Sequence, residues 1–300
     1  MKKFRLHVIK LSKLFFIISG ILTLITFTSL AIQGLNFGID FVGGTITQIE
    51  LHTTFETSDI RQITDQYDPS CEITSGGDDQ TQVIISSKVD FTDEQKVSFF
   101  NDFKSKYNLS DDDLLSFDNV SPTIGKELQQ QALYASVITV VCILIYVTFR
   151  FEFYFGLTAI IALVHDLLIV LGVYTLFQLP VNSSFIAAML TILGYSINDT
   201  IVVFDRIREN RRKYSKFDYG NLIDDSINQT LARSINTSLT TVMAITALYI
   251  VGVSSIREFI LPLILGFISG TYSSIFIASS LWYVIKNNQA KKIQAKLKTR

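Results

Sequence analysis

An acidic residue lies within a stretch of this sequence that is otherwise suited to lipid. Asp199 follows Asn198 near the end of the apolar segment 183–204. Insertion of an acidic side chain at the centre of a membrane helix costs about 2.5–3.5 kcal/mol, so such a residue predicts a functional site with a partner group. Arg233, the first basic residue of another apolar segment, is the candidate partner. A carboxylate and a guanidinium that pair and separate are suited to proton transfer across a membrane.

Helical geometry brings the two residues to similar depths. Asp199 lies about five residues, or roughly 8 Å, before the end of its span, and Arg233 enters the next span from the same side. Asn198 shares a helix face with Asp199, and Thr237 lies one turn beyond Arg233. These two polar faces predict a hydrated seam between neighbouring helices. A static ion pair that orders the bundle is the alternative, and the polar residues could also serve only as contacts between helices.

His165 and Asp166 form a second polar group, near the midpoint of a third apolar segment. They are candidates for the same proton pathway, although His165 could simply bind a neighbouring helix. An intramembrane enzyme that uses this pair is a further alternative. The three histidines of the sequence lie at different depths, and no HExxH pattern accompanies them. We therefore predict neither an enzyme nor a site for a metal or another cofactor.

The composition shows what must position these residues. Hydrophobic residues make up 48% of the chain and charged residues 18%, and the apolar residues occur in blocks long enough to cross a membrane. Six transmembrane helices are predicted, at 14–32, 132–149, 155–177, 183–204, 235–252 and 259–285. The first is longer than the apolar region of a signal peptide and has no clear cleavage site, so it is interpreted as an uncleaved anchor.

Basic residues predict the orientation of the helices. They cluster in the amino-terminal segment 1–13, in the loop 205–234 and in the tail 286–300. Because cytoplasmic segments carry an excess of lysine and arginine, both termini are expected in the cytoplasm. Residues 33–131 then form an extracytoplasmic domain. The basic loops are explained by topology and do not indicate binding to nucleic acid.

The domain at 33–131 has the pattern of a small α/β fold. Strands are predicted at 45–51, 71–74, 82–86 and 114–120, and helices at 58–67 and 92–107, with a turn at 76–79. Thr92 is expected to cap the second helix, with Gln95 at its third position. The order β-α-β-β-α-β is that of the ferredoxin-like split motif, a fold that hosts many functions. The predicted fold class is therefore a polytopic α-helical membrane protein with a ferredoxin-like domain between helices 1 and 2.

Four sequence motifs carry a resemblance to a known family. They are GIDFVGG at 38–44, VHD at 164–166, GYSINDTIVVFDRIREN at 194–210 and ARSINTS at 232–238. Together they resemble the SecD/SecF family of bacterial protein-export subunits, within the resistance-nodulation-division superfamily. The motif at 194–210 is long and specific. In the outer domain the resemblance is limited to its size, its β-α-β-β-α-β order and the glycine motif.

The resemblance implies a function and partners. Members of this family pair with SecD in the bacterial cytoplasmic membrane and use the proton-motive force to draw chains through the SecYEG channel. It further implies an indirect link to SecA and accessory contacts with YajC and YidC. The proton-pathway positions of the family fall on Asp199 and Arg233, and Thr237 matches a further polar position.

The resemblance leaves other interpretations open. Gly38, Gly43 and Gly44 have a structural explanation as a flexible exit from the membrane, since no phosphate-binding pattern accompanies them. The remaining alternative is a stand-alone proton-coupled transporter of the same superfamily. Such transporters normally carry two six-span halves on one chain.

Overall fold

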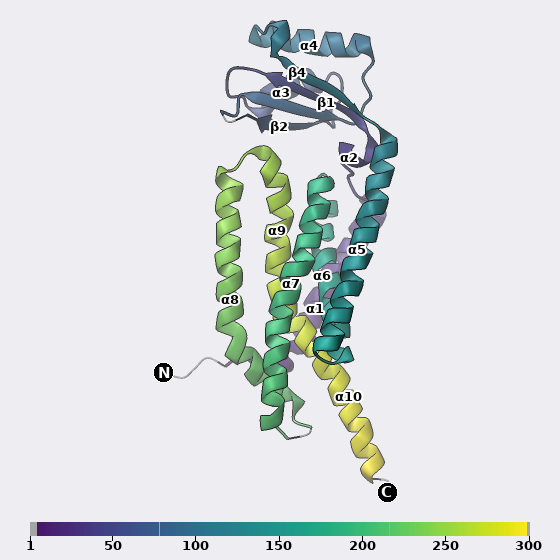
Figure 1. Cartoon of the computed structure of the whole chain (residues 1–300), viewed down its shortest axis with the longest axis vertical. Helices are drawn as coiled ribbons and strands as arrows, with labels where there is room; N and C mark the ends of the chain where they lie inside the picture. The colour runs from purple at the N-terminus through teal and green to yellow at the C-terminus, as the bar shows by residue number, and fades with distance from the viewer. Residues whose placement is uncertain (1–4, 78, 216, 299–300) are drawn as a thin grey trace.

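A computed structural model, which describes residues 5–77, 79–215 and 217–298, shows a bundle of long helices with a small α/β domain over one end (Figure 1). Within these residues, six helical segments are long and apolar enough to cross a membrane: Val8–Gln33, Gly125–Arg150, Phe153–Leu176, Ser183–Lys213, Tyr219–Val251 and Ile256–Lys296. The prediction of six such helices is confirmed. Parts of the predicted termini, residues 1–4 and 299–300, lie outside the described residues.

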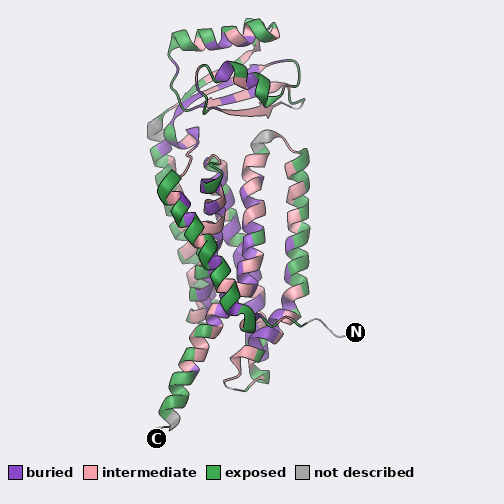
Figure 2. Cartoon of the chain, turned by 180° about the vertical axis from the view of Figure 1, so that it is seen from behind, coloured by how far each residue is buried: buried purple, intermediate pink, exposed green. Residues whose placement is uncertain are grey.

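The bundle consists of α1 (Val8–Gln33), α5 (Pro122–Arg150), α6 (Phe153–Leu176), α7 (Ser183–Asn210), α8 (Tyr219–Val251), α9 (Ser254–Tyr272) and α10 (Ser279–Lys298). A 3-10 turn, η2 (Arg211–Lys213), ends α7, and a π-helical segment, η3 (Ser273–Ala278), joins α9 to α10. Many apolar side chains of α1 and α5 are exposed, up to 88% at Phe149, which suits contact with lipid. Exposed residues run along α1, which lies at the front of the bundle in Figure 2.

Small residues allow the helices to approach one another. A Cβ atom added to Gly172 of α6 would lie 2.1 Å from Thr26 Oγ1 of α1, and one added to Gly156 would lie 3.0 Å from Thr148 Oγ1 of α5. Ala159 and Ala162 between them are buried. Glycine and alanine at these positions therefore bring α1 and α5 close to opposite ends of α6, as expected for packing in a membrane.

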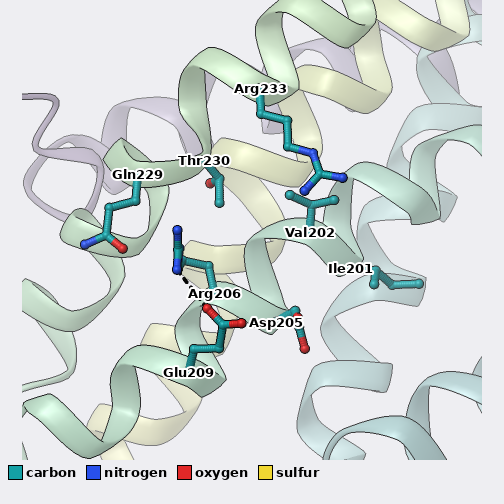
Figure 3. Close-up of a pocket in the computed structure, with 8 residues that line it drawn as sticks. All are labelled: Ile201, Val202, Asp205, Arg206, Glu209, Gln229, Thr230 and Arg233. Carbon is teal, nitrogen blue, oxygen red and sulfur yellow. Dashed lines mark hydrogen bonds and ion pairs between the residues drawn. The ribbon is translucent and has the colours of Figure 1, made fainter.

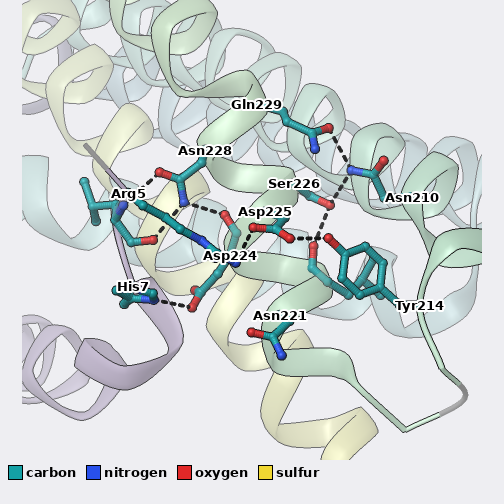
Figure 4. A network of polar contacts seen from close by, with 12 residues as sticks. Arg5, His7, Asn210, Tyr214, Asn221, Asp224, Asp225, Ser226, Asn228 and Gln229 are labelled. Carbon is teal, nitrogen blue, oxygen red and sulfur yellow. Dashed lines mark hydrogen bonds and ion pairs between the residues drawn. The ribbon is translucent and has the colours of Figure 1, made fainter. Parts of the chain in front are cut away.

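The connection predicted at 205–234 is largely helical. α7 continues to Asn210, and α8 already begins at Tyr219, where Asp218 accepts a hydrogen bond from the amide of Asn221. The early start of α8 has a packing reason, which Figure 4 shows. Asn228 of α8 exchanges two hydrogen bonds with the backbone of Leu6, both 2.8 Å long. The first turns of α8 thereby hold the segment that leads into α1.

The α/β domain follows α1 in the order α2 (Ile39–Val42), β1 (Gly44–Glu50), α3 (Thr57–Thr64), β2 (Glu72–Gly76), β3 (Gln82–Ser87), α4 (Asp93–Tyr107), η1 (Asp111–Asp113) and β4 (Leu114–Val120). Its sheet has the strand order β2-β3-β1-β4, and each neighbouring pair is antiparallel. Thr92 and Gln95 form the expected capping box of α4. The turn predicted at 76–79 contains Asp78, which lies outside the described residues.

Several contacts attach this domain to the bundle. The amide of Gly38 donates to the carbonyl of Val181 over 2.7 Å, just before α7. The amide of Ser183 donates to Asp40 Oδ2 over 2.8 Å. On the other side, the carboxyl groups of Glu72 in β2 and Glu258 in α9 lie within hydrogen-bonding distance. The sheet is thus held against the ends of two helices that also carry the polar residues of the membrane core.

Candidate functional site

Asp199 is buried on α7, with 4% of its surface exposed. Its Oδ2 accepts a hydrogen bond of 3.1 Å from Ser238 Oγ of α8. Ser238 in turn accepts a 2.6 Å hydrogen bond from Thr271 Oγ1 of α9. A short line of hydroxyl groups therefore leads from the carboxylate across three helices. Hydroxyl groups both donate and accept, so such a line can pass a proton.

Arg233 lies five residues before Ser238 on α8, which is about 7.5 Å farther along the helix, away from the α/β domain. It is exposed and lines a cavity of about 330 Å³ together with Asp205, Arg206 and Glu209 of α7. Figure 3 shows its side chain extending toward Val202 of α7.

Arg233 is close enough for its charge to act on the Asp199 carboxylate. No ion pair within 4.0 Å joins these two residues among the pairs formed in the described part of the chain. In this conformation the guanidinium faces the cavity and Ser238 is the hydrogen-bond partner of Asp199. The site therefore has a buried acid and a separate, accessible guanidinium cation on the side away from the α/β domain.

Asp166 of α6 is completely buried and lies among hydroxyl groups. Ser196 of α7 and Ser273 of η3 each donate to its Oδ2 over 2.7 Å, and Ser269 of α9 donates to its Oδ1 over 2.8 Å. His165 Nδ1 lies 3.3 Å from the same Oδ1. The carboxylate thus joins three helical elements to α6, which gives it a structural role in the bundle.

The π-helical segment η3 brings two consecutive serines into this core. Ser273 reaches Asp166, and Ser274 Oγ lies 2.8 Å from Thr200 Oγ1 of α7. Single π turns inside α-helices are frequent at functional sites. Gly270, one turn before, lies against Ser196: an added Cβ would be 2.9 Å from the Cβ of that serine.

The remaining predicted pathway residues face away from the core. Asn198 and Thr237 are exposed, unlike their neighbours Asp199 and Ser238. Tyr195 connects α7 to α8 about one turn closer to the α/β domain, where its hydroxyl donates to Thr241 Oγ1 over 3.0 Å. The polar faces of α7 and α8 are therefore only partly turned toward each other, and part of each faces outward.

Sequence reasoning missed the serines that surround the two acids. Ser238 lies inside the motif at 232–238, but its position beside Asp199 depends on which face of α8 packs against α7. The sequence did contain a signal for the others, because Ser273 and Ser274 follow Ser269 by four and five residues within an apolar span. Such a stripe on one helix face predicts hydrogen bonds across a helix interface.

Backbone conformation and close packing explain the three glycines of the motif at 38–44. Gly43 and Gly44 have φ angles of 82° and 139°, which residues other than glycine rarely adopt. An added Cβ on Gly44 would also lie 2.1 Å from the carbonyl oxygen of Ser87. Gly38 packs against Val181 and Asn182 at the start of α7. These glycines let the chain turn from α2 directly into β1.

Comparisons with known proteins identify the family of this chain. Residues 101–288 match the family described as "Protein export membrane protein SecD/SecF, C-terminal", and residues 28–54 match the "SecD/SecF GG Motif". The protein translocase subunit SecF of Sebaldella termitidis is 38% identical over 286 residues, which cover 94% of this chain and 92% of that protein. The protein translocase subunit SecDF of Bacillus subtilis is also 38% identical, over 94% of this chain but 38% of its own length.

Solved structures extend the likeness to the fold. A crystal structure of SecDF from Thermus thermophilus, titled a translocon-associated membrane protein, aligns with a TM-score of 0.80 and 35% identity. The alignment covers 95% of this chain and 39% of that chain, so this chain spans about two fifths of the larger protein. From the family match over more than half of its length and from relatives that it covers almost end to end, the chain belongs to the SecD/SecF family of protein export membrane proteins.

Proposed function

We propose that this accessory subunit of Sec protein export uses the proton-motive force, together with SecD, to complete the passage of preproteins through SecYEG. The observation that carries the proposal is Asp199, a buried acid in a membrane span whose hydroxyl relay ends at Thr271. Arg233 lines a separate cavity, farther from the α/β domain than Asp199. A group of this kind can take up a proton from one side and release it to the other.

In this proposal Asp199 is the proton carrier and Arg233 is the cation that it attracts when ionised. Asn198 and Thr237 would line the pathway where it meets the partner chain. Asp166 and His165 would support it from the centre of the bundle. A proton that crosses 100 mV releases about 2.3 kcal/mol, which is sufficient to bias two helix packings that differ by a similar amount.

The same proposal sets the orientation. The multi-pass chain lies in the bacterial cytoplasmic membrane with both termini in the cytoplasm, and its α/β domain is extracytoplasmic. We also propose that the spans and loops have the boundaries predicted from hydropathy. The strand order and the two helices support a ferredoxin-like class for the domain between helices 1 and 2.

SecD is the proposed partner within the membrane. Asn198, Asn236, Thr237 and Thr240 are exposed on helices that would otherwise meet lipid, where polar groups are costly. A second six-helix unit would cover them, and relatives named SecDF carry additional chain. The proposed partners also include the SecYEG channel, SecA through an indirect link, and YajC and YidC as accessory subunits. The stand-alone transporter is not favoured, since the relatives are protein translocase subunits.

Export by inverted vesicles tests the proton step. We expect the substitution Asp199→Asn, which keeps size and hydrogen bonding, to leave insertion and partner binding intact and to abolish the gradient-dependent part of preprotein export. Collapse of the gradient with an ionophore provides the control, because wild-type and Asp199→Asn vesicles should then export at the same rate. Gradient-dependent export at the wild-type rate by the Asn variant would refute the proposal.

A further inference from the structure

A basic cavity lies at the end of the bundle opposite the α/β domain. Its walls come from the α5–α6 turn, the end of α7 with η2, the start of α8, and α10. Its volume is about 330 Å³, which is at the small end of the range for ligand pockets. It is separate from the cavity that Arg233 lines. The proton pathway proposed above makes no use of it.

Cationic side chains dominate the lining of this cavity. As far as the described residues form it, the lining contains Arg208, Arg211, Arg212 and Lys286, and one carboxylate, that of Glu152. Lys286 Nζ donates to Glu152 over 2.6 Å, so this carboxylate is already paired with a cation. Arg212 is exposed at the cavity wall. Arg208 Nη2 donates to Asp205 Oδ1 over 2.9 Å. The four cations still outnumber these two carboxylates, which favours an anion, and guanidinium groups in particular suit the oxygens of a phosphate.

The floor of the cavity is aromatic and contains a polar atom without a partner. Trp282 is 2% exposed and stacks on Phe155, with ring centroids 4.6 Å apart and planes 10° apart. Lys286 Nζ lies 5.7 Å from the Trp282 ring centre. The indole Nε1–H is buried and has no acceptor among the described residues. Buried donors are normally satisfied, so an acceptor oxygen from a ligand would complete this site.

The position of the cavity indicates where the ligand comes from. The span in α5 ends at Arg150 and the span in α6 begins at Phe153, so the turn at Glu152 lies where two helices leave the hydrocarbon layer. Tryptophan and basic residues at this level are typical of the membrane interface, where lipid phosphates lie. Basic pockets between transmembrane helices are suited to anionic headgroups.

We propose that this cavity binds the phosphate of an anionic phospholipid headgroup. Free inorganic phosphate offers the same oxygens, but the apolar floor and the interfacial depth favour a ligand that also has a glycerol backbone and acyl chains. Arg208 would contact the phosphate from the end of α7, Arg212 from η2, and Lys286 from α10. The lipid would thereby join the end of α7 to α10 and the α5–α6 turn.

The single tryptophan of the chain provides a direct reporter, because Trp282 forms the cavity floor. The full-length chain in detergent would be titrated with brominated phosphatidylglycerol and, separately, with brominated phosphatidylcholine, while tryptophan emission is followed. We expect saturable quenching by phosphatidylglycerol at concentrations about tenfold lower than by phosphatidylcholine. Equal quenching by both lipids in the wild-type chain would overturn the proposal, and this comparison needs no variant.

A matched pair of variants tests the residues. Arg212→Glu should weaken phosphatidylglycerol binding by about tenfold, because it reverses a charge at the cavity wall. Lys292→Glu, which reverses an exposed charge farther along α10, should change it by less than about twofold. Equal effects of both would indicate general surface attraction and contradict a built site. Displacement of the lipid by millimolar inorganic phosphate would assign the cavity to the free anion instead. Asp199→Asn should leave lipid binding unchanged, which separates this result from the proton pathway.

Discussion

The two membrane acids show that residue type alone does not define a role. Asp166 accepts hydrogen bonds from three serines on three helical elements, and its position is determined by that shell. Asp199 accepts a hydrogen bond from Ser238 and lies near the Arg233 charge. The first arrangement resembles a structural junction, whereas the second leaves the carboxylate free to change partners. Residue-scale substitutions should therefore have different consequences at the two positions.

Removal of the Asp166 carboxylate is expected to destabilise the bundle. Asp166→Ala removes the acceptor of three buried hydroxyls. Ser273 still has the carbonyl of Gly270 as an acceptor at 3.2 Å, whereas Ser196 and Ser269 lose the acceptor that they use, at a cost of about 1–3 kcal/mol for each unsatisfied group. Thermal unfolding of the purified chain in detergent should show a clear fall in the midpoint. Asp199→Ala, which removes the acceptor of one serine hydroxyl, should lower the midpoint less. An unchanged midpoint for Asp166→Ala would argue against the structural junction.

Substitution of Arg233 separates a static role from a switching one. Lysine keeps the charge but lacks the planar fork of arginine. We expect Arg233→Lys to be nearly as inactive as Arg233→Ala in gradient-driven export, with little change in the thermal midpoint because Arg233 is exposed. Normal export by the Lys variant, together with destabilisation by Ala alone, would favour the static pair.

At the scale of elements, α8 links the site to the end of the molecule. Its middle carries Ser238 and Arg233, and its first turns bind the segment that leads into α1 through Asp224 and Asn228 (Figure 4). The amide of Ile9 donates to Asp224 Oδ1 over 3.0 Å. A shift of α8 relative to α7 would therefore also be felt at the start of α1.

Loss of the Asn228 side chain should loosen that segment locally. Asn228→Ala removes two hydrogen bonds to the backbone of Leu6, so hydrogen exchange across residues 5–9 should accelerate by about tenfold, the equivalent of one net hydrogen bond. Asn221→Ala is the matched control, because Asn221 binds Asp218 at the start of its own helix. Equal exchange in the two variants would mean that Asn228 does not hold the segment.

At the scale of the whole molecule, two carboxyl groups meet where the α/β domain contacts the bundle. A hydrogen bond between Glu72 and Glu258 requires that one of them carries a proton. Burial at this interface raises the pKa of Glu72, and the nearby Asp40 acts in the same direction. The hydrogen bond to Glu258 and the Lys88 charge act against it. The attachment of the domain is therefore sensitive to the pH on its own side of the membrane.

The sign of that dependence follows from the raised pKa. The attached state binds its proton more tightly than the detached state, so attachment is strongest at pH below the ordinary glutamate range and weakens as the pH rises through the raised value. We expect hydrogen exchange across β2, corrected for intrinsic rates, to increase as the pH is raised from 5 to 8, because the pKa of Glu72 lies above the ordinary glutamate value. Glu72→Gln should remove most of the change, and Glu94→Gln on exposed α4 should not.

Features that depend on local composition could be predicted from the residues alone. The lengths of the apolar blocks were sufficient to predict six helices that are long and apolar enough to cross a membrane. Alternation of apolar and polar residues predicted the strands, and capping signals predicted α4, whose Thr92 and Gln95 form the expected capping box. The cost of charge in lipid was sufficient to single out Asp199 and Asp166 as buried acids. These inferences need only a residue and its neighbours along the chain.

Tertiary structure alone decided which groups meet. Hydropathy does not specify how a helix is rotated about its axis, so Ser238 beside Asp199, and Asn198 and Thr237 facing outward, could not be read from the residues. The π-helical segment that directs Ser273 at Asp166 depends on packing between α6, α7 and α9. The cavity above Trp282 is built from elements distant in sequence. In each case the physical reason is the same: contacts between helices are determined by shape complementarity over the whole bundle, which no local pattern encodes.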